Sequence, residues 1–421
     1  MAREYKDSGI EWIGRIPKDW KVKPHKRLMK KIKNLCSEYN GEDIISLTMN
    51  GVIVRDLTAG GKMPTSFDGY QYVYPGNLLM CLFDIDVTPR CVGLIKNVGL
   101  TSPAYSQFAL FNGAYGPYYN YLLRYMDDEK CILHLSKNLR SSLTEDDFGQ
   151  IPTIQPPLDE QRAIASYLDR KCAEIDSLVE LQEQMIAQLT DYKQSVITEA
   201  VTKGLNPEAE LVPSGIDWIG DIPKGWRVNK VNRLFGIIGS GTTPNSSDDD
   251  AFVGSINWLQ SGDINGSIIT NACKKISNET LDKYSVLSVY KAPFIIVAMY
   301  GASVGNISIS HIDACVNQAC CVLSDSKIDF TYAFYAIKSA QRYLIFRAVG
   351  GGQPNISQYT LRQLCIPEPP LAEQQSIASY LDTKCHEIDS LIELKRQKIE
   401  TLKDYKKSVI FEAVTGKTNI D

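Results

Sequence analysis

The side chains of this chain that could do chemistry are mainly amides, hydroxyls and arginines in loops that also contain glycine or proline. Examples are Gly241–Asn245, Val316–Gln318 and Gln353–Asn355. An amide side chain offers the paired donor and acceptor that reads adenine in the major groove of DNA, and arginine does the same for guanine. The same residue types favour tight turns for conformational reasons alone. Base reading and plain turns therefore both remain open at this point.

The sequence contains no arrangement of residues typical of catalysis, cofactor binding or metal binding. An adenine methyltransferase is expected to carry an Asn/Asp-Pro-Pro-aromatic loop, and the nearest string, Ser102–Tyr105, lacks its essential residues. Gly239–Gly241 does not continue as a dinucleotide-binding fingerprint, and Gly416–Thr418 only imitates the end of a phosphate loop. The four histidines lack ligand-like spacing, and none of the eleven cysteines forms a Cys-x-x-Cys pair. We therefore predict a non-catalytic chain with no cofactor and no metal.

A run of cations lies close to the N-terminus. Residues 18–33 hold eight basic side chains (Lys18, Lys21, Lys23, Lys26, Arg27, Lys30, Lys31 and Lys33) against the single acid Asp19. Such a run suits neutralisation of DNA phosphates. The solvated face of a helix explains it equally well. Over the whole chain the net charge is −4, so we expect no general electrostatic attraction to nucleic acid.

Composition places the chain among ordinary globular proteins. Apolar residues make up 44% and charged residues 22% of the 421 residues, which excludes a disordered or fibrous class. The charged opening MAREYKDSGI has no apolar core of a signal peptide, and no apolar stretch is long enough to span a bilayer. Eleven cysteines, two of them adjacent, favour a reducing compartment. We expect a cytoplasmic protein without a membrane partner.

The elements that must position these loops come in two copies. Residues 8–28 and 214–234 share 13 of 21 positions at an offset of 206, and residues 156–202 and 369–415 share 33 of 47 at an offset of 213. The stretches between these repeats show almost no common sequence. Because matching of this kind does not arise by chance, the pattern indicates a duplicated scaffold that carries two diverged modules.

The second repeat predicts a long helix, because a Pro-Pro pair precedes a stretch of good helix formers without Gly or Pro. A heptad count predicts a coiled-coil seam that lasts more than four heptads. An amphipathic face on a globular core is the alternative. The first predicted seam position comprises Leu168, Ile175, Gln182, Leu189 and Val196, with Leu381, Ile388, Lys395, Leu402 and Val409 in the second copy. The second comprises Ile164, Lys171, Leu178, Met185 and Tyr192, with Ile377, Lys384, Leu391, Lys398 and Tyr405.

The modules read as mixed domains rich in strands, because short apolar runs are broken by Gly, Pro and Asp. Each ends in a short helix before its Pro-Pro pair. The predicted fold is therefore α+β, with two α/β modules separated by a pair of long helices that form an antiparallel coiled coil, in a pseudo-two-fold arrangement. The intervening module forces the antiparallel direction.

Over its whole length the chain resembles the specificity subunits of type I restriction-modification systems. The resemblance rests on the two S-G-I-x-W-I-G-x-I-P-x-x-W openings, the two P-P-L-x-E-Q-x-x-I-A-S-Y-L-D helices, the string from Gly239, and GGGQPNIS before Pro369. It implies two target recognition domains that each read half of a split, asymmetric site in double-stranded DNA. It also implies helices that space these domains and dock two modification (methyltransferase) subunits, with ATP-dependent restriction subunits as further partners.

The resemblance divides the chain into target recognition domain 1 (1–155), a first helical spacer (156–204), target recognition domain 2 (205–368) and a second helical spacer (369–421). At the 213 offset, Arg140–Ser142 replaces the second module's Gln353–Asn355, so the first module departs further from the family pattern. From composition we predict DNA contacts by Arg90, Lys96, Ser102, Tyr105 and Arg140 in the first module, and by Thr242, Thr243, Asn245, Ser261, Tyr300, Ser303, Asn317, Gln353 and Asn355 in the second.

Two other classes of function remain as alternatives. One is an enzyme, a fused methyltransferase or nuclease, which the missing cofactor loop disfavours. The other is a structural coiled-coil scaffold unrelated to DNA. Methyl-donor assays of the isolated chain test the first alternative, and salt-dependent duplex binding tests the second.

Overall fold

The computed structural model shows two compact units, each built from both halves of the sequence. The first unit comprises Met1–Glu183 with Arg396–Asp421, and the second comprises Gln184–Lys395. The structure describes residues 3–58, 64, 66–88, 90–131, 133, 141–245, 249–301, 303–349 and 354–420.

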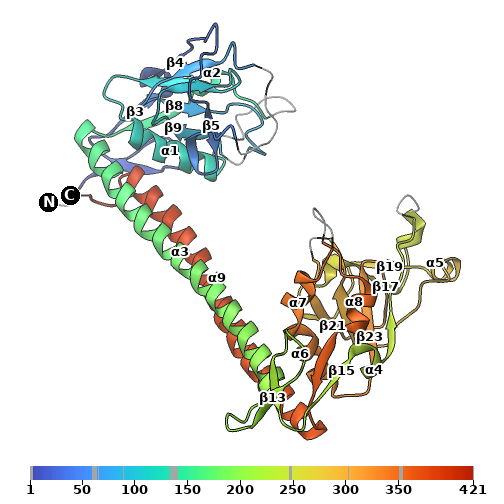
Figure 1. Ribbon diagram of the computed structural model, residues 1–421. Helices are drawn as coiled ribbons and strands as arrows, with labels where there is room; N and C mark the ends of the chain where they lie inside the picture. The colour runs from blue at the N-terminus through green and yellow to red at the C-terminus, as the bar shows by residue number, and fades with distance from the viewer. Residues whose placement is uncertain are drawn as a thin grey trace. The chain divides into compact units, whose positions relative to one another are not determined.

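The first unit is centred on a four-stranded antiparallel sheet in the order β4-β11-β8-β9 (Figure 1). Its strands are β1 (Tyr5–Asp7), β2 (Arg15–Pro17), β3 (Lys21–Pro24), β4 (Met29–Ile32), β5 (Ile45–Thr48), β6 (Gly51–Val54), β7 (Gln71–Val73), β8 (Leu78–Met80), β9 (Val92–Leu94), β10 (Gly99–Thr101), β11 (Ser106–Leu110) and β12 (Pro152–Gln155). Its short helices are α1 (Gly116–Asp128) and α2 (Glu145–Gln150).

The second unit is centred on a five-stranded sheet in the order β16-β23-β20-β21-β18, next to a three-stranded sheet β19-β17-β22. Its strands are β13 (Leu211–Pro213), β14 (Asp221–Pro223), β15 (Arg227–Lys230), β16 (Phe235–Gly239), β17 (Ile256–Leu259), β18 (Ile268–Ile269), β19 (Lys274–Ile276), β20 (Phe294–Ala298), β21 (Ile307–Ser310), β22 (Ala314–Val316), β23 (Cys320–Ser326) and β24 (Cys365–Glu368). Its short helices are α4 (Val231–Leu234), α5 (Asn278–Lys283), α6 (Phe330–Ser339), α7 (Gln341–Phe346) and α8 (Gln358–Gln363).

The two modules share an order of elements although their sequences have diverged. Strands β4, β8, β9 and β11 pair in the same way as β16, β20, β21 and β23. The helix before the last strand is also capped alike. The Thr144 hydroxyl accepts from the backbone N–H of Asp147, and the Ser357 hydroxyl accepts from that of Thr360. Thr144 and Ser357 lie 213 residues apart, so the duplication includes the modules.

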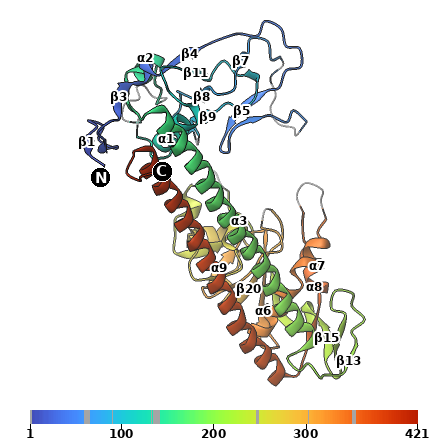
Figure 2. The ribbon, with the colours of Figure 1, turned by 90° about the vertical axis from the view of Figure 1, so that its left-hand side faces the viewer.

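Two long helices, α3 (Leu158–Lys203) and α9 (Leu371–Val414), run side by side (Figure 2). Each follows a Pro-Pro pair, and each is followed by a glycine with positive φ, Gly204 and Gly416. Proline suits the start of a helix, and glycine suits the left-handed residue after its end.

Ion pairs fix the antiparallel register of these helices in both units. In the first unit Lys406 Nζ lies 2.6 Å from Asp176 Oδ1, and in the second Lys193 Nζ lies 2.6 Å from Asp389 Oδ2. Residues 176 and 389, like 193 and 406, are equivalent at the 213 offset. One ion pair therefore recurs in each unit, with its partners exchanged between the two helices.

The first predicted seam position is confirmed, because Leu168, Ile175 and Gln182 are at most 5% exposed. The second is confirmed only at Ile164 and Ile377, which are 1% and 0% exposed, and is wrong further along the helices, where Leu178 and Tyr192 are 45% and 56% exposed. The buried side chains lie four residues after the first seam position and not three. They are Cys172, Ile392, Cys385, Ile399, Ala200 and Ala413, with Lys193 and Lys406 at the same heptad position. A heptad pattern permits a spacing of either three or four residues. The small Cys and Ala side chains at the four-residue spacing let the two helices pack closely against each other.

The repeated sequence motifs meet where each module joins its helix. The indole N–H of Trp20 donates to Glu160 at 2.9 Å, and that of Trp226 donates to Glu373 at 2.9 Å. Each tryptophan is the last residue of the S-G-I-x-W-I-G-x-I-P-x-x-W motif, and each glutamate belongs to the P-P-L-x-E-Q motif. Because a buried indole needs an acceptor, this contact accounts for the recurrence of both motifs.

The glutamine of the second motif fixes the helix that follows the sheet. Gln161 Oε1 accepts from the backbone N–H of Tyr115, before α1, and Gln374 Oε1 accepts from that of Asp329, before α6. Both amides also donate to the carbonyl of the first proline of their Pro-Pro pair. The motif thus orients each module relative to its own stretch of long helix.

Candidate nucleic-acid interface

In the second unit, several candidate loops leave the same end of the five-stranded sheet. Strand β16 ends there at Gly239 and β20 ends at Ala298, whereas β23 begins there at Cys320 and β21 at Ile307. Neighbouring strands are antiparallel, so the end of one adjoins the start of the next. We call residues 240–245, 299–301, 303–306, 317–319 and 354–356 the loop edge of the second unit.

Contacts to backbone carbonyl groups hold these loops together. The Ser240 hydroxyl donates to the carbonyl of Cys320 at 2.7 Å. Gly241 follows with its Cα against Val316, where a Cβ atom would lie 1.8 Å from the carbonyl oxygen. Only glycine permits this approach of two backbones. The loop edge is therefore a built surface with a fixed arrangement.

Polar side chains from separate loops meet on this surface. The Thr243 hydroxyl donates to Gln318 Oε1 at 2.6 Å. Tyr300 pairs with Asn355 through an isolated antiparallel bridge, and the backbone N–H of Ile356 donates to the carbonyl of Met299 at 2.7 Å. Threonine, glutamine, tyrosine and asparagine thus come together from four segments that span more than a hundred residues of sequence.

The structure places the remaining predicted residues of this unit around the same surface. Thr242 accepts from the Trp258 indole through its carbonyl, and Ser303 lies in the loop after β20. Ser261 opens a short 3₁₀ turn after β17, next to Asn317, whose backbone N–H donates to Leu259. The exposed Asn245 donates its backbone N–H to the Tyr284 hydroxyl. Gln353 lies outside the described residues.

Asn317, a predicted DNA contact, points into its own turn, and its neighbour Gln318 is the exposed amide. Asn317 is only 9% exposed, and its Oδ1 accepts from the backbone N–H of Ala319, so this amide stabilises the turn. Its neighbour Gln318 is exposed and was not among the predicted residues. The signal was present, because the loop Val316–Gln318 stood out, but sequence alone does not say which amide faces outwards.

The first unit has an equivalent surface. Strands β4 and β8 end at Ile32 and Met80, whereas β9 and β11 begin at Val92 and Ser106. Residues 33–36, 81–88, 90–91, 102–105 and 141–143 form the loop edge of this unit. Leu143 donates its backbone N–H to Leu82 at 2.8 Å, the counterpart of the contact between Ile356 and Met299.

Of the predicted residues in the first unit, Ser102 and Tyr105 lie on this surface. Gln71 Nε2 donates to the carbonyls of both, at 3.1 and 2.6 Å, and the Tyr105 ring stacks on Phe83 with centroids 6.5 Å apart. Lys96 is exposed but follows β9 at the opposite end of the sheet. Arg140 lies outside the described residues.

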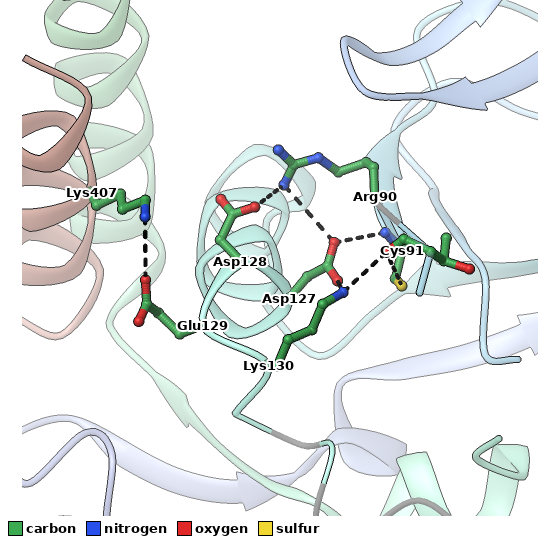
Figure 3. Close-up of polar contacts among 8 residues, drawn as sticks. Arg90, Cys91, Asp127, Asp128, Glu129, Lys130 and Lys407 are labelled. Atoms are coloured by element: carbon green, nitrogen blue, oxygen red, sulfur yellow. Dashed lines mark hydrogen bonds and ion pairs between the residues drawn. The ribbon is translucent and has the colours of Figure 1, made fainter. Parts of the chain in front are cut away.

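The guanidinium group of Arg90 is paired with two carboxylates (Figure 3). Its Nη1 lies 2.8 Å from Asp128 Oδ1 and 3.9 Å from Asp127 Oδ2, and its side chain is 10% exposed. Asp127 also accepts from the backbone N–H of Cys91 and from Lys130 Nζ, at 2.7 and 2.8 Å. This network ties the loop before β9 to the end of α1, so Arg90 has a structural role.

The cationic run near the N-terminus forms strands β3 and β4 with a 3₁₀ turn between them, so the explanation as a helix face is wrong. Lys18 pairs with Glu4, and Lys31 pairs with Glu145. Lys33 is exposed and follows β4 directly, at the loop edge. Most of the other cations lie towards the far end of β4 and away from the candidate loops.

His25, within this run, is a core residue. It is fully buried, stacks on Phe148 with ring centroids 4.5 Å apart, and its Nδ1 lies 3.3 Å from the Phe148 carbonyl oxygen. Burial lowers the pKa of His25 from 6.5 to about 4, against the weaker opposing effect of that carbonyl. The imidazole is therefore neutral at physiological pH and adds no charge to the surface.

Among the residues that the structure describes, no group of three or more His, Cys, Asp or Glu side chains is arranged to hold a metal ion. In the same described ranges no helix is both long and apolar enough to cross a membrane.

Comparison with known proteins shows which family this chain is similar to. The type I restriction modification DNA specificity domain matches residues 223–404. A protein of Methanocaldococcus jannaschii named as the specificity subunit of the type I restriction enzyme MjaX is 24% identical, over 97% of this chain and 96% of its own length. Over nearly its whole length the chain is thus similar to specificity subunits of type I restriction-modification systems.

Two solved structures share its fold. One, described under the assembly and conformational transition of the type I restriction-modification system, has a TM-score of 0.72 at 17% identity and covers 96% of this chain and 99% of its own. The other, the HsdS subunit from Thermoanaerobacter tengcongensis, has a TM-score of 0.51 at 15% identity, with coverages of 96% and 98%. These findings confirm the α+β fold, and the relatives are named as specificity subunits.

Proposed function

We propose that this specificity subunit reads a two-part site in double-stranded DNA, with the loop edge of each unit contacting one part. The observation that carries the proposal is the loop edge itself. Two modules of the same construction, which share almost no sequence, present loops at the same end of the sheet. Each bidentate contact to a base contributes only about 1–3 kcal/mol of discrimination. Reading a sequence therefore requires several exposed side chains held together on one rigid support.

In the second unit the proposed base-reading residues are Thr243, Gln318, Tyr300 and Asn355, with Ser303 beside them. Gln353, outside the described residues, is kept as a contact predicted from sequence. Amide groups such as those of Gln318 and Asn355 match the paired donor and acceptor of adenine. We assign Asn317 to the support of this surface.

In the first unit we propose Ser102, Tyr105 and Arg140 as base contacts and Lys33 as a phosphate contact. Arg90 and Lys96 are not carried forward, because the first is held by carboxylates and the second lies at the other end of the sheet.

The long helices supply a second surface, which we propose as the docking face for modification subunits. In the first unit Leu178, Leu181 and Tyr405 are 45%, 46% and 54% exposed. In the second unit their equivalents at the 213 offset, Leu391, Leu394 and Tyr192, are 47%, 61% and 56% exposed. Contiguous exposed apolar residues of this kind mark protein interaction sites.

Leu178 and Tyr405 lie on the same side of the helix pair. Both occupy the heptad position next to the seam, where residues of antiparallel helices face each other, and Tyr405 also interacts electrostatically with Lys171, two turns before Leu178 on the same face. The same pattern recurs for Leu391, Tyr192 and Lys384. Two equivalent patches fit two modification subunits, and we expect ATP-dependent restriction subunits to join that assembly in the cytoplasm.

The proposal is tested by sequencing the methylated motif of cells that carry variants of the gene. Exchanging one module should change one half of the motif only. An insertion of one heptad in both helices keeps the seam in phase and should lengthen the spacer by about three base pairs, from a rise of about 1.5 Å per residue against 3.4 Å per base pair. Altered bases after the helix insertion, or a changed spacer alone after the module exchange, would show that this division of roles is wrong.

The docking face is tested by Leu391→Glu with Leu394→Glu, and separately by Leu178→Glu with Leu181→Glu. Light scattering of the assembled complex should show one modification subunit per chain for either double variant and none for the quadruple variant. Two subunits retained in the quadruple variant would place docking elsewhere. The matched control is Glu180→Lys, an exposed change on the same helix away from the apolar patch.

A further inference from the structure

One apolar group on the second unit remains unexplained by base reading with polar side chains. At the end of α7, Ile345, Phe346 and Val349 are 42%, 85% and 79% exposed. A single exposed apolar residue is ordinary, but three within five residues form a patch. Phe346 is exposed over most of its ring although the preceding Leu344 is fully buried, so the helix presents this aromatic outwards.

Contacts place this patch beside the loop edge. Ile345 packs against Gly305 in the loop after β20, where a Cβ atom would lie 2.7 Å from Ile345 Cγ1. Val349 exchanges both backbone hydrogen bonds with Asn355, each at 3.0 Å, and Asn355 bridges to Tyr300. Phe346 is thus three residues from the strand-like pair that carries two of the proposed base-reading residues.

A cation accompanies the aromatic ring. Arg347 is exposed, and within the described part of the chain no carboxylate lies at ion-pair distance from it. An apolar side chain flanked by a cation and by hydrogen-bonding loops is the arrangement that proteins use to kink DNA. The apolar group enters between two base pairs and unstacks them, while arginine neutralises the adjacent phosphate.

From this geometry we propose that Phe346 is a wedge that inserts between two base pairs of the half-site bound by the second unit, with Arg347 on a neighbouring phosphate. The proposal rests on the proposed function, since it needs duplex DNA at the loop edge. It adds a contribution from DNA deformability, because the cost of unstacking depends on the base step. The first unit has no counterpart among its described residues, since Leu133 at the 213 offset is half-buried.

The test uses the full chain with its modification subunits and a duplex that carries the methylated motif found by sequencing. The adenine analogue 2-aminopurine is placed in turn at each step of the half-site read by the second unit. Binding of the unaltered protein should raise its fluorescence at one step through unstacking. Phe346→Ala should abolish that rise and weaken binding about ten-fold, as expected for one lost aromatic stack, whereas Phe346→Met should retain the rise because methionine also serves as a wedge.

Two controls separate the possible failures. Ile268→Ala removes an apolar side chain that is 53% exposed on edge strand β18 and should change nothing. Arg347→Ala should reduce the salt dependence of binding by about one phosphate contact and leave the fluorescence step in place. Normal binding by the unaltered protein with no fluorescence step, or a step that survives Phe346→Ala, would overturn the wedge alone. Loss of salt-dependent duplex binding by the unaltered complex would instead refute the proposed function.

Discussion

The two units differ most clearly where the first motif packs against the end of a long helix. In the first unit three rings stack, Trp12 on Tyr125 at 5.8 Å and Tyr125 on Phe411 at 5.0 Å. In the second unit Trp218 stacks on Tyr343 at 6.0 Å, and Thr198 stands where the first unit has Phe411. A hollow of about 580 Å³ lies beside Thr198, Trp218 and Tyr343.

This difference shows how a duplicated frame tolerates loss of an aromatic side chain. The backbone and the tryptophan anchors are the same, so the absent ring leaves an open hollow and not a collapsed core. A second difference concerns His25 of the first unit. Its equivalent in the second unit, at the 206 offset, is Val231. The following experiments break or sharpen the comparison between the units, from the largest expected effect to the smallest.

The largest effect is expected from the tryptophan anchors. Trp20→Ala should lower the free energy of unfolding of the first unit by about 3–5 kcal/mol, because it removes a fully buried ring, although Glu160 keeps Arg3 as a donor. Trp226→Ala should act on the second unit only and by a similar amount, because its ring is slightly more exposed, at 9%, but Glu373 has no counterpart of Arg3, residue 209 being alanine. Hydrogen exchange resolved by peptide measures each unit. Equal loosening of both units by either variant would contradict separate anchoring.

Acid should destabilise the first unit more than the second. The pKa of His25 is about 4 in the folded protein and 6.5 when exposed, so unfolding takes up a proton between these values. The stability that His25 contributes is present above pH 6.5 and falls by about 3 kcal/mol as the pH drops towards 4. His25→Val, which copies Val231, should remove this part of the pH dependence from the exchange rates of the first unit. An unchanged pH profile would show that His25 is not the responsible group.

The aromatic stack predicts opposite effects of reciprocal changes. Phe411→Thr should destabilise the first unit by about 2 kcal/mol, since it removes a half-buried ring in contact with Tyr125. Thr198→Phe should stabilise the second unit, because it fills the hollow beside Trp218. Thermal unfolding together with local hydrogen exchange checks both. Destabilisation by Thr198→Phe would mean that the hollow cannot accept a ring in the geometry of the first unit.

The smallest effect is expected from the recurrent ion pairs. Asp389→Asn and Asp176→Asn should each cost about 0.5 kcal/mol, because both carboxylates are more than half exposed. A double-mutant cycle with Lys193 or Lys406 measures the coupling. The two cycles should agree, since the pairs are equivalent. A large coupling in one only would show that the two halves of the helix pair are packed differently.

The sequence by itself determined the duplication, the long helices, their antiparallel direction and the resemblance to specificity subunits, because helix periodicity and repeated motifs are local properties of the chain. It also identified the loops that meet in the second unit, since glycines and amides that favour turns can be recognised from the residue types alone.

Only the tertiary structure decided which side of each helix is buried. The sequence pattern is compatible with a second buried position three or four residues after the first, and only packing against the partner helix selects between them. It likewise decided that Arg90 is held by Asp127 and Asp128, that Asn317 supports a turn while Gln318 is exposed, and that Phe346 is exposed at the loop edge. These outcomes depend on neighbours that are distant in sequence. A residue's type states which interactions it can make, and the fold decides which of them are already satisfied.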